Sequence, residues 1–371
     1  MKNANILIVG AGIGGLSAAI ALHRKGHVVT LIERDPHWSV YGVGIIQQSN
    51  VIRAMDDLGV LEPFLDTAFG FDAVEIFAPD GHKVARVPTP QLIPGRPSNV
   101  GISRRALQKV LADQAAACGA KTRLGLTVSS LVDDGAMVDA TFSDGSYGRF
   151  DMVIGADGVY SQIREMILPD AEGPQFTGQS VWRYNLPRPA DLDALQVYNG
   201  PTGVGLVPMS AELMYMYVTT PEPGNPRYPQ AGIAAEMRSK LANCSTPIRE
   251  LGEQIVDDGG VVYRPLEGML VTGDWHKGRI GLLGDAVHAT TPHLGQGAGM
   301  AIEDGIVLAD ELSRHDTVEA ALRAYRDRRY ERCAYIVKSS LAICQGQLGF
   351  APAVDNHKAT AEMFAVVAQP I

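Results

Sequence analysis

A short run of glycines near the amino terminus has the spacing of a phosphate-binding turn. Gly10, Gly12 and Gly15 form the pattern G-x-G-x-x-G, and Glu33 follows at the end of the next predicted strand. Gly10 permits the tight turn, Gly12 lets a pyrophosphate approach the backbone, and Gly15 lets a helix pack closely on a strand. Glu33 is placed to accept hydrogen bonds from ribose hydroxyls. Together these residues predict a dinucleotide site.

The elements that must position this turn can be read on both sides of it. Residues 6–9 are a short apolar run, typical of a strand buried on both faces of a parallel sheet. Residues 17–25 are a predicted helix, whose amino terminus offers unpaired N–H groups to phosphates. Gly26 stands where a left-handed helix cap is expected, and 28–32 is a second strand. A glycine turn without a ligand is the alternative, but this order of elements makes the dinucleotide site the stronger interpretation.

Two charged residues are predicted at element ends that can face a ligand. Ser103 is a natural cap for a predicted helix over 106–118, so Arg104 lies at a helix start, where its charge is poorly placed. A cation held there indicates an anionic partner such as a phosphate, and a solvated surface arginine is the alternative. Asp157 ends a buried strand within 151–158 and points into the crevice where open α/β sheets bind ligands.

Two more glycine-rich segments are predicted to bring backbone close to a ligand. Residues 41–45 form a loop before a predicted helix over 49–58. Residues 278–285 repeat the buried-strand pattern, and 286–299 form a longer loop before a predicted helix over 300–312. The amino terminus of that helix can neutralise negative charge developing on a ring system.

The middle of the chain has a different composition. Residues 71–87 and 138–150 are predicted hairpins, and alternating, aromatic-rich segments between 177 and 266 predict antiparallel strands with one helix over 231–244. Residues 320–330 and 332–345 predict two further helices. We therefore predict an α/β fold, in which a Rossmann-like nucleotide domain carries an inserted, mainly antiparallel β domain and C-terminal helices. The predicted limits are 1–71, 96–173 and 268–340 for the nucleotide domain, 72–95 and 174–267 for the inserted domain, and 341–371 for a C-terminal helical tail.

Charge and cysteine usage exclude several classes of partner. The 371 residues include 32 Lys and Arg against 41 Asp and Glu, a formal net charge of −9, and no basic block occurs. Nucleic acid and membrane surfaces are therefore not expected as partners. The four cysteines have neither a C-x-x-C pair nor zinc-type spacing, so we expect reduced thiols, no metal site and a cytoplasmic protein.

The uncharged run over 6–22 also has to be weighed as a signal peptide or membrane anchor. Gly10, Gly12, Gly14 and Gly15 would weaken the helix that either segment needs, whereas each has a place in the nucleotide turn. We expect neither.

Three motifs stand in order along the chain. They are G-A-G-I-G-G over 10–15 with Glu33, G-A-D-G-V-Y-S-Q-I-R over 155–164, and G-D-A-V-H-A-T-T-P-H-L-G-Q-G over 284–297 followed by Asp304. In this combination the chain resembles the class A flavin-dependent aromatic hydroxylases, the p-hydroxybenzoate hydroxylase-like family of FAD monooxygenases. The third motif looks most like the salicylate and hydroxynicotinate hydroxylases. The resemblance spans residues 5 to about 329, and the triple combination is highly specific.

The resemblance implies both a cofactor and a reaction. The nucleotide domain would be an FAD-binding domain, and the inserted domain would bind the substrate. NADH or NADPH would reduce FAD, and dioxygen would add to give a flavin C4a-hydroperoxide that hydroxylates a small phenolic or N-heteroaromatic substrate. Oligomeric state stays open between monomer and homodimer.

The resemblance also implies a set of cofactor-binding residues. Glu33 would hold the adenosine ribose, Arg104 the flavin phosphate or ribityl region, and Asp285 the ribityl chain. The backbone over 295–299 would line the isoalloxazine, whereas Ser49 and Val51 depart from the family pattern and leave the shape of that wall open. The full set is Gly10, Gly12, Ile13, Gly14, Gly15, Glu33, Arg34, Gly44, Ile45, Arg104, Asp157, Gly158, Asp285, Pro292, Gly295, Gln296, Gly297 and Ala298.

Three residues are candidates for the chemistry on the substrate. His293 directly follows Pro292 in the loop implied to lie beside the flavin and titrates near neutral pH, so it is the candidate base. Its alternative is a histidine that only hydrogen-bonds the loop. Tyr215, on the same strand face as Tyr217, is a candidate to orient the substrate, with sheet packing as the alternative. Arg183 is a candidate to neutralise a carboxylate or the charge beside the flavin, with a structural ion pair as the alternative.

Two other functions compete with aromatic hydroxylation. One is an epoxidase or reductase with the same fold, acting on a non-aromatic substrate. The other is a catalytically silent FAD-binding regulator. The epoxidase or reductase ranks well below hydroxylation, because the sequence has few long apolar segments and no carboxyl-terminal membrane helix is expected.

Overall fold

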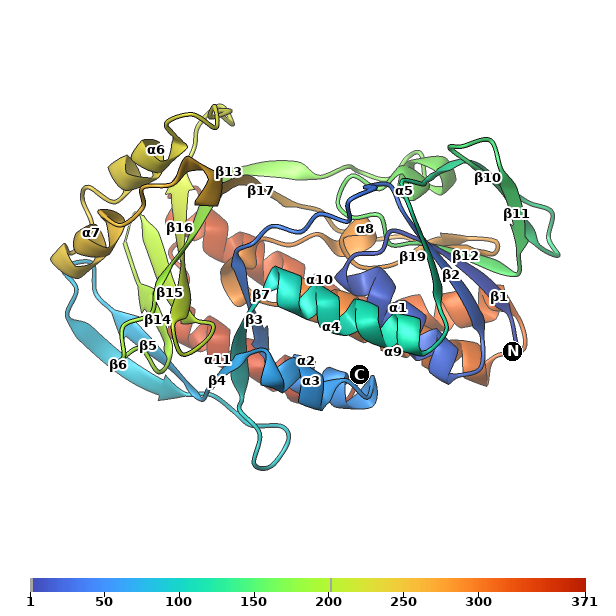
Figure 1. Cartoon of the computed structure of the whole chain (residues 1–371), viewed down its shortest axis with the longest axis horizontal. Helices are drawn as coiled ribbons and strands as arrows, with labels where there is room; N and C mark the ends of the chain where they lie inside the picture. The colour runs from blue at the N-terminus through green and yellow to red at the C-terminus, as the bar shows by residue number, and fades with distance from the viewer. Residues whose placement is uncertain (1–2, 201) are drawn as a thin grey trace.

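Two large sheets organise the chain, and Figure 1 shows them at opposite ends of an elongated molecule. The computed structural model describes residues 3–200 and 202–371. A six-stranded sheet has the order β18-β19-β12-β1-β2-β8, and a seven-stranded sheet has the order β17-β13-β16-β15-β14-β5-β6. The α/β fold class is therefore confirmed.

The six-stranded sheet is parallel except for β18 at its edge. Its central strand β1 pairs Ile6 with Met152 on one side and with Val29 on the other, and all three side chains are buried. Burial on both faces explains the continuous apolar run of β1. The strands are β1 (Asn5–Val9), β2 (Val28–Glu33), β8 (Lys121–Leu124), β12 (Met152–Gly155), β18 (His276–Lys277) and β19 (Ile280–Leu282).

Helices α1 (Ile13–Arg24), α4 (Arg104–Ala117) and α9 (Gly297–Arg314) pack together beside this sheet. Gly305 lets the backbones of α9 and α1 approach closely, because a Cβ there would lie 2.6 Å from the backbone nitrogen of Ala18. Two predicted helices begin too late in the chain. Helix α1 starts at Ile13 rather than at 17, and α9 starts at Gly297 rather than at 300, because glycines at a phosphate-type turn also form the first helical turn.

The seven-stranded sheet is antiparallel except where β14 pairs with β5. Helices α6 (Ile233–Lys240) and α7 (Thr246–Gly252) cover its outer face (Figure 1), where Trp182, Met214 and Met216 join a separate apolar core. Only α6 was predicted, over 231–244. The strands are β5 (Ala73–Phe77), β6 (Lys83–Pro88), β13 (Gln175–Pro187), β14 (Leu195–Tyr198), β15 (Gly203–Pro208), β16 (Leu213–Pro221) and β17 (Val262–Gly268).

Smaller elements connect the two sheets or flank them. Ser103 caps α4 by accepting a hydrogen bond from the Ala106 N–H at 3.1 Å, as predicted. One three-stranded sheet contains β3 (Gly44–Gln48), β7 (Asn99–Ser103) and β4 (Phe69–Phe71), and another contains β11 (Tyr147–Phe150), β10 (Val138–Phe142) and β9 (Val128–Asp133). The short helices are α2 (Ser49–Asp57), α3 (Leu61–Asp66), α5 (Gln162–Ile167), η1 (Asp258–Gly260), α8 (Asp285–His288) and η2 (Pro292–Leu294).

The carboxyl-terminal region is helical, but its division was predicted wrongly. Helix α10 (Val318–Gln347) is continuous, where two helices over 320–330 and 332–345 were predicted. Glu331 is a good helix former, so nothing local ends the helix there. A boundary between 340 and 341 falls inside α10, and the remaining limits of the discontinuous domain division stay predictions. Helix α11 (Asn356–Ala368) follows. Within residues 3–200 and 202–371, no helix is long and apolar enough to cross a membrane.

Candidate active site

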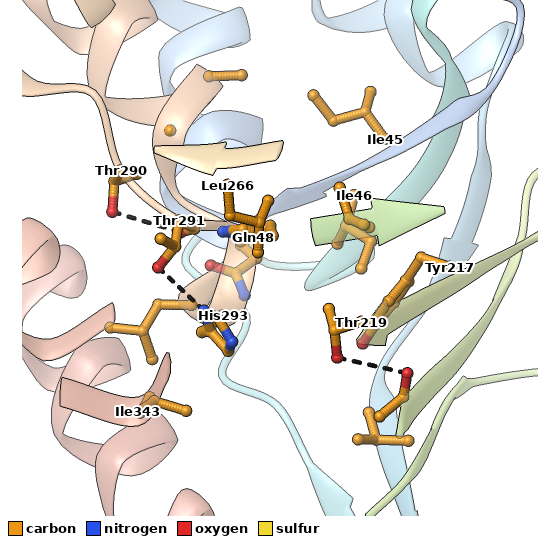
Figure 2. Close-up of a pocket in the computed structure, with 18 of the residues that line it drawn as sticks. Ile45, Ile46, Gln48, Tyr217, Thr219, Leu266, Thr290, Thr291, His293 and Ile343 are labelled. Atoms are coloured by element: carbon orange, nitrogen blue, oxygen red, sulfur yellow. Dashed lines mark hydrogen bonds between the residues drawn. The ribbon is translucent and has the colours of Figure 1, made fainter. Parts of the chain in front are cut away.

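A cavity of about 1090 Å³ lies between the two sheets. One end is bounded by the glycine turn before α1, and the other by β5, β14 and α11. Between these ends, β3 and the loop containing His293 face strand β16, and Figure 2 shows His293 and Tyr217 on opposite sides of this space. The volume is at the upper limit of ordinary small-molecule pockets, roughly 300–1,000 Å³, so an extended ligand and a second molecule can both fit.

The glycines at the first end divide into two roles. Gly12 and Gly158 line the cavity, and a Cβ on either would meet no atom within 4 Å, so their backbones are open to a ligand. Gly10 serves the tight turn and Gly15 the close packing of helix on strand, as predicted. A Cβ on Gly15 would lie 2.0 Å from the Gly10 carbonyl oxygen, and one on Gly10, at φ +106°, would lie 2.3 Å from that of Ala156.

Two predicted cofactor acids hold backbone together instead of lining the cavity. Glu33 accepts hydrogen bonds from the Ala11 N–H at 3.1 Å and the Asp35 N–H at 3.0 Å, which ties the glycine turn to the end of β2. Asp157 accepts from the Ser161 hydroxyl at 2.5 Å and the Ile163 N–H at 3.1 Å, at the start of α5. Burial raises the pKa of Asp157. The ribose contact of Glu33 stays a prediction.

The other predicted cofactor residues fall into two groups. Arg34 is exposed, and the buried Gln296 side chain donates to Asn50 Oδ1 at 3.0 Å and to the side-chain oxygen Oε1 of Gln48. Neither lines the cavity. Those that do line it are Gly12, Ile13, Gly14, Gly44, Ile45, Arg104, Gly158, Asp285, Pro292, Gly295, Gly297 and Ala298.

Two guanidinium groups face the middle of the cavity. Burial, together with the nearby charge of Arg104, lowers the pKa of Arg183 to about 10. Burial also lowers the pKa of Arg104, which Tyr215 and Asp285 oppose. Among the described residues, neither guanidinium has a hydrogen-bond or ion-pair partner. Two partly buried cations that face the cavity without a protein partner favour an anionic ligand there, because an opposite charge stabilises a guanidinium. The structural ion pair considered for Arg183 is thus not formed.

Strand β16 contributes two tyrosines, two positions apart and therefore on the same face. Tyr215 and Tyr217 line the cavity, whereas Met214 and Met216 enter the core on the opposite face, as the period-two pattern predicted. Tyr215 also packs on the loop of the nucleotide domain, because a Cβ on Gly44 would lie 2.0 Å from its ring. Burial raises the pKa of Tyr215 to about 12 and raises that of Tyr217 as well, so both phenols stay protonated.

His293 lines the cavity, but both ring nitrogens already have partners, of which Figure 2 shows Thr291. Its Nε2 lies 3.1 Å from Gln347 Oε1, and its Nδ1 lies 2.9 Å from the Thr291 hydroxyl. A carbonyl oxygen only accepts, so Nε2 carries the hydrogen and Nδ1 accepts from Thr291. Burial lowers the pKa of His293 to about 4, which keeps the ring neutral at neutral pH.

Several lining residues were missed by reasoning from the sequence. Gln48 ends β3 beside His293 (Figure 2), and Gln347 reaches the loop from α10. Thr360 and Phe364 reach the cavity from α11, a segment predicted only as a helical tail. A signal existed for α11 in the apolar spacing of its residues, but Gln48 and Gln347 have no motif.

A buried ion network supports the turn at Asp285. Asp304 accepts from the Gly284 N–H at 2.9 Å and contacts His288 Nε2 at 2.6 Å and Arg329 Nε at 2.8 Å. Although burial opposes ionisation, His288 and Arg329 hold the pKa of Asp304 well below its usual range. His288, Asp304 and Cys333 lie close enough to hold a metal ion. The guanidinium of Arg329, however, already supplies a positive charge to the Asp304 carboxylate.

Comparison with known proteins agrees with this geometry. Residues 3–340 match the family model described as "FAD binding domain". The putative FAD-dependent monooxygenase YetM of Bacillus subtilis (strain 168) is 32% identical over 361 residues, covering 95% of this chain and 96% of that protein. The 3-hydroxybenzoate 6-hydroxylase of Polaromonas naphthalenivorans (strain CJ2) is 31% identical over 348 residues, covering 90% and 86%.

A solved structure extends the similarity to three dimensions. Klebsiella pneumoniae HpxO complexed with FAD and uric acid superposes with a TM-score of 0.82 at 25% identity, covering 99% of this chain and 93% of that chain. The chain belongs to the FAD binding domain family and is an FAD-dependent monooxygenase of the flavin-dependent aromatic hydroxylase class. The predicted family and the FAD cofactor are confirmed.

Proposed function

We propose that this monooxygenase hydroxylates a small phenolic or N-heteroaromatic substrate that binds as an anion, with NADH or NADPH as reductant and dioxygen as oxidant. The observation that carries the proposal is the pair of partnerless guanidiniums, Arg104 and Arg183, inside a cavity that also presents two neutral tyrosines. Relatives that act on hydroxybenzoate and that bind uric acid support the substrate class. We further propose a cytoplasmic protein that acts as a monomer or homodimer.

The residues that line the first end would hold the cofactor. Gly12 and Gly158 offer open backbone to its phosphates, and Asp285, which is exposed to the cavity, offers a carboxylate to its hydroxyls. The backbone from Gly295 to Ala298 would lie along its ring. Bound FAD supplies electron transfer from the reductant and activation of dioxygen.

The substrate end of the cavity favours an ionised hydroxyl. Arg183 lies partly buried in the cavity wall near Arg104, so a bound phenolate gains more from these charges than it would in water. An electron-rich phenolate ring is the form that an electrophilic oxygen attacks. Tyr215 and Tyr217 stay protonated and can donate hydrogen bonds that orient the ring. The substrate therefore does not need a strong protein base.

His293 has a smaller part in this proposal than in the prediction from sequence. Its Nδ1 accepts from Thr291, and its pKa of about 4 makes it a weak base. The contacts favour the alternative role, in which His293 joins the loop beside the flavin to Gln347 of α10. A role as the base stays a prediction.

Flavin reduction and oxygen incorporation together test the function. Protein loaded with FAD would be mixed with NADH or NADPH and a panel of phenolic and hydroxypyridine acids, and the product analysed after reaction with isotopically labelled dioxygen. We expect at least one acid to accelerate flavin reduction and to gain one labelled oxygen atom. Reduction without label in any product would contradict hydroxylation and leave a reductase.

A further inference from the structure

A second cavity of about 400 Å³ adjoins the active-site cavity on the side away from the glycine turn. It lies between the edge of the seven-stranded sheet, the segment 87–90 and helix α11. The two cavities share the lining residues Val74, Ile76, Val197, Asn199, Asn356, Thr360 and Phe364. The second cavity therefore continues the site already described.

The walls of this second cavity are mostly apolar on both sides, with Thr89, Asn199, Asn356 and Thr360 as the polar lining residues. Val74 and Ile76 of β5 alternate along one face of the strand, and Val197 of β14 is the register partner of Ile76. Opposite them, α11 contributes five residues spaced along one helical face, namely Thr360, Ala361, Phe364, Ala365 and Ala368. Among the described residues that line it, none is charged.

Small side chains leave this space open, and it reaches the protein surface. Ala361 and Ala365 of α11 are exposed, as are Pro88 and Pro90 at the opposite rim. From Thr360 to Ala368 the helix rises about 12 Å, at 1.5 Å per residue. The second cavity, which we call the apolar channel, thus adjoins the active-site cavity at the end away from the glycine turn and is open to the solvent.

We propose that the substrate carries an unbranched hydrocarbon tail, which lies in this channel while its hydroxylated ring lies near Arg183. This inference rests on the proposed function, since it assigns the second half of the same ligand. A small polar acid would gain nothing from a charge-free channel of this size. Each methylene of a tail buried there gains about fourfold in affinity.

A series of 4-n-alkylphenols, from the unsubstituted ring through methyl, butyl and heptyl to decyl, tests the tail on the FAD-loaded full chain. Dissociation constants come from the change in the flavin spectrum, and turnover from NADH and NADPH oxidation. We expect affinity to rise about fourfold per methylene and to level off once the channel is full. Affinity that does not depend on chain length would overturn the proposal.

Blocking variants separate the channel from general hydrophobic binding. Ala365→Phe is expected to weaken heptylphenol binding at least tenfold while leaving phenol binding unchanged, and Ala361→Phe repeats the test at the neighbouring position. Glu362→Phe is the matched control, because Glu362 is exposed on α11 and lines neither cavity. Equal loss in the control, or no loss in either blocking variant, would contradict the channel.

The same experiment distinguishes failure of the tail from failure of the proposed function. If short phenols are hydroxylated but chain length has no effect, the tail proposal is wrong and the hydroxylase stands. If long-chain phenols bind with the expected dependence and the alanine variants abolish it, yet no phenol is hydroxylated, the channel stands and the proposed reaction is wrong.

Discussion

The two ends of the active-site cavity are built in opposite ways. At the nucleotide end, glycines and backbone groups from short contiguous motifs do most of the work, and Gly12 and Gly158 are open where a side chain would intrude. At the substrate end, side chains from many separated elements meet, including Arg183 from β13, Tyr217 from β16 and Phe364 from α11. The nucleotide end tolerates few substitutions, because the backbone itself forms its walls. The substrate end is formed by side chains, so it can change one residue at a time.

A substitution in the glycine turn is expected to have the largest effect on stability, and it tests whether the nucleotide end depends on backbone packing. Gly15→Val would place side-chain carbons at a Cβ position 2.0 Å from the Gly10 carbonyl oxygen, and backbone cannot move aside there. We expect a loss of more than about 4 kcal/mol in the free energy of unfolding, with little soluble yellow protein. Gly12→Ala is the matched control, since its Cβ meets no atom; it should fold normally and lose FAD affinity only.

The second largest effect on stability is expected from the buried ion network of Asp304, His288 and Arg329. Asp304→Asn removes the carboxylate that the buried Arg329 and His288 share and leaves Arg329 with Glu303 alone, so we expect a loss of about 3 kcal/mol, measured by urea unfolding of the FAD-loaded chain. The exposed pair of Lys109 and Asp113 offers a control, because Asp113→Asn should change stability by less than about 1 kcal/mol. Similar losses in both would mean that the network contributes no special support.

At the substrate end, Arg183→Gln tests binding without disturbing the fold. Its guanidinium contacts no described partner, so we expect unfolding to change little. Losing a charged contact to an anionic ligand costs about 1.5–3 kcal/mol, or roughly 10- to 150-fold in substrate affinity. Titration of phenolic acids against the flavin spectrum measures the loss. Reduced FAD content with normal substrate affinity would instead place Arg183 in the cofactor site.

His293 gives a dependence on pH with a defined sign. Its pKa is about 4 in the folded chain and about 6.5 when unfolded, so the unfolded state binds more protons between these values. The stability that neutral His293 contributes is complete above about pH 6.5 and falls by at most about 3 kcal/mol as the pH drops toward 4. Urea unfolding over this range, compared with His293→Ala, should show a flatter profile in the variant. An identical profile in both proteins would contradict the lowered pKa.

The smallest effect is expected at Tyr217. Tyr217→Phe removes one neutral hydrogen-bond donor and keeps the ring packed against Gly205, so we expect about 1 kcal/mol, or less than tenfold in kcat/KM. Tyr215→Phe is the comparison, because its ring also supports Gly44 of the nucleotide domain. A loss of several hundredfold in Tyr217→Phe would assign its hydroxyl a direct part in catalysis.

The nucleotide end of the cavity could be predicted from local sequence, whereas the substrate end depends on tertiary contacts. The sequence by itself determined the nucleotide end, because a strand, a glycine turn and a helix use neighbouring residues and cannot be built without Gly10 and Gly15. It also determined the alternation of Tyr215 and Met216, because a strand has a period of two.

Only the tertiary structure decided what surrounds these residues. It pairs His293 with Gln347, more than fifty positions away. It also buries His293, and this burial lowers the pKa of a residue that looked like a base from its motif. It leaves Arg183 and Arg104 close together and without an ion-pair partner among the described residues, and it brings α11 over the sheet edge to form the channel. These relations depend on which distant elements pack together, and burial and charge at a site follow from that packing.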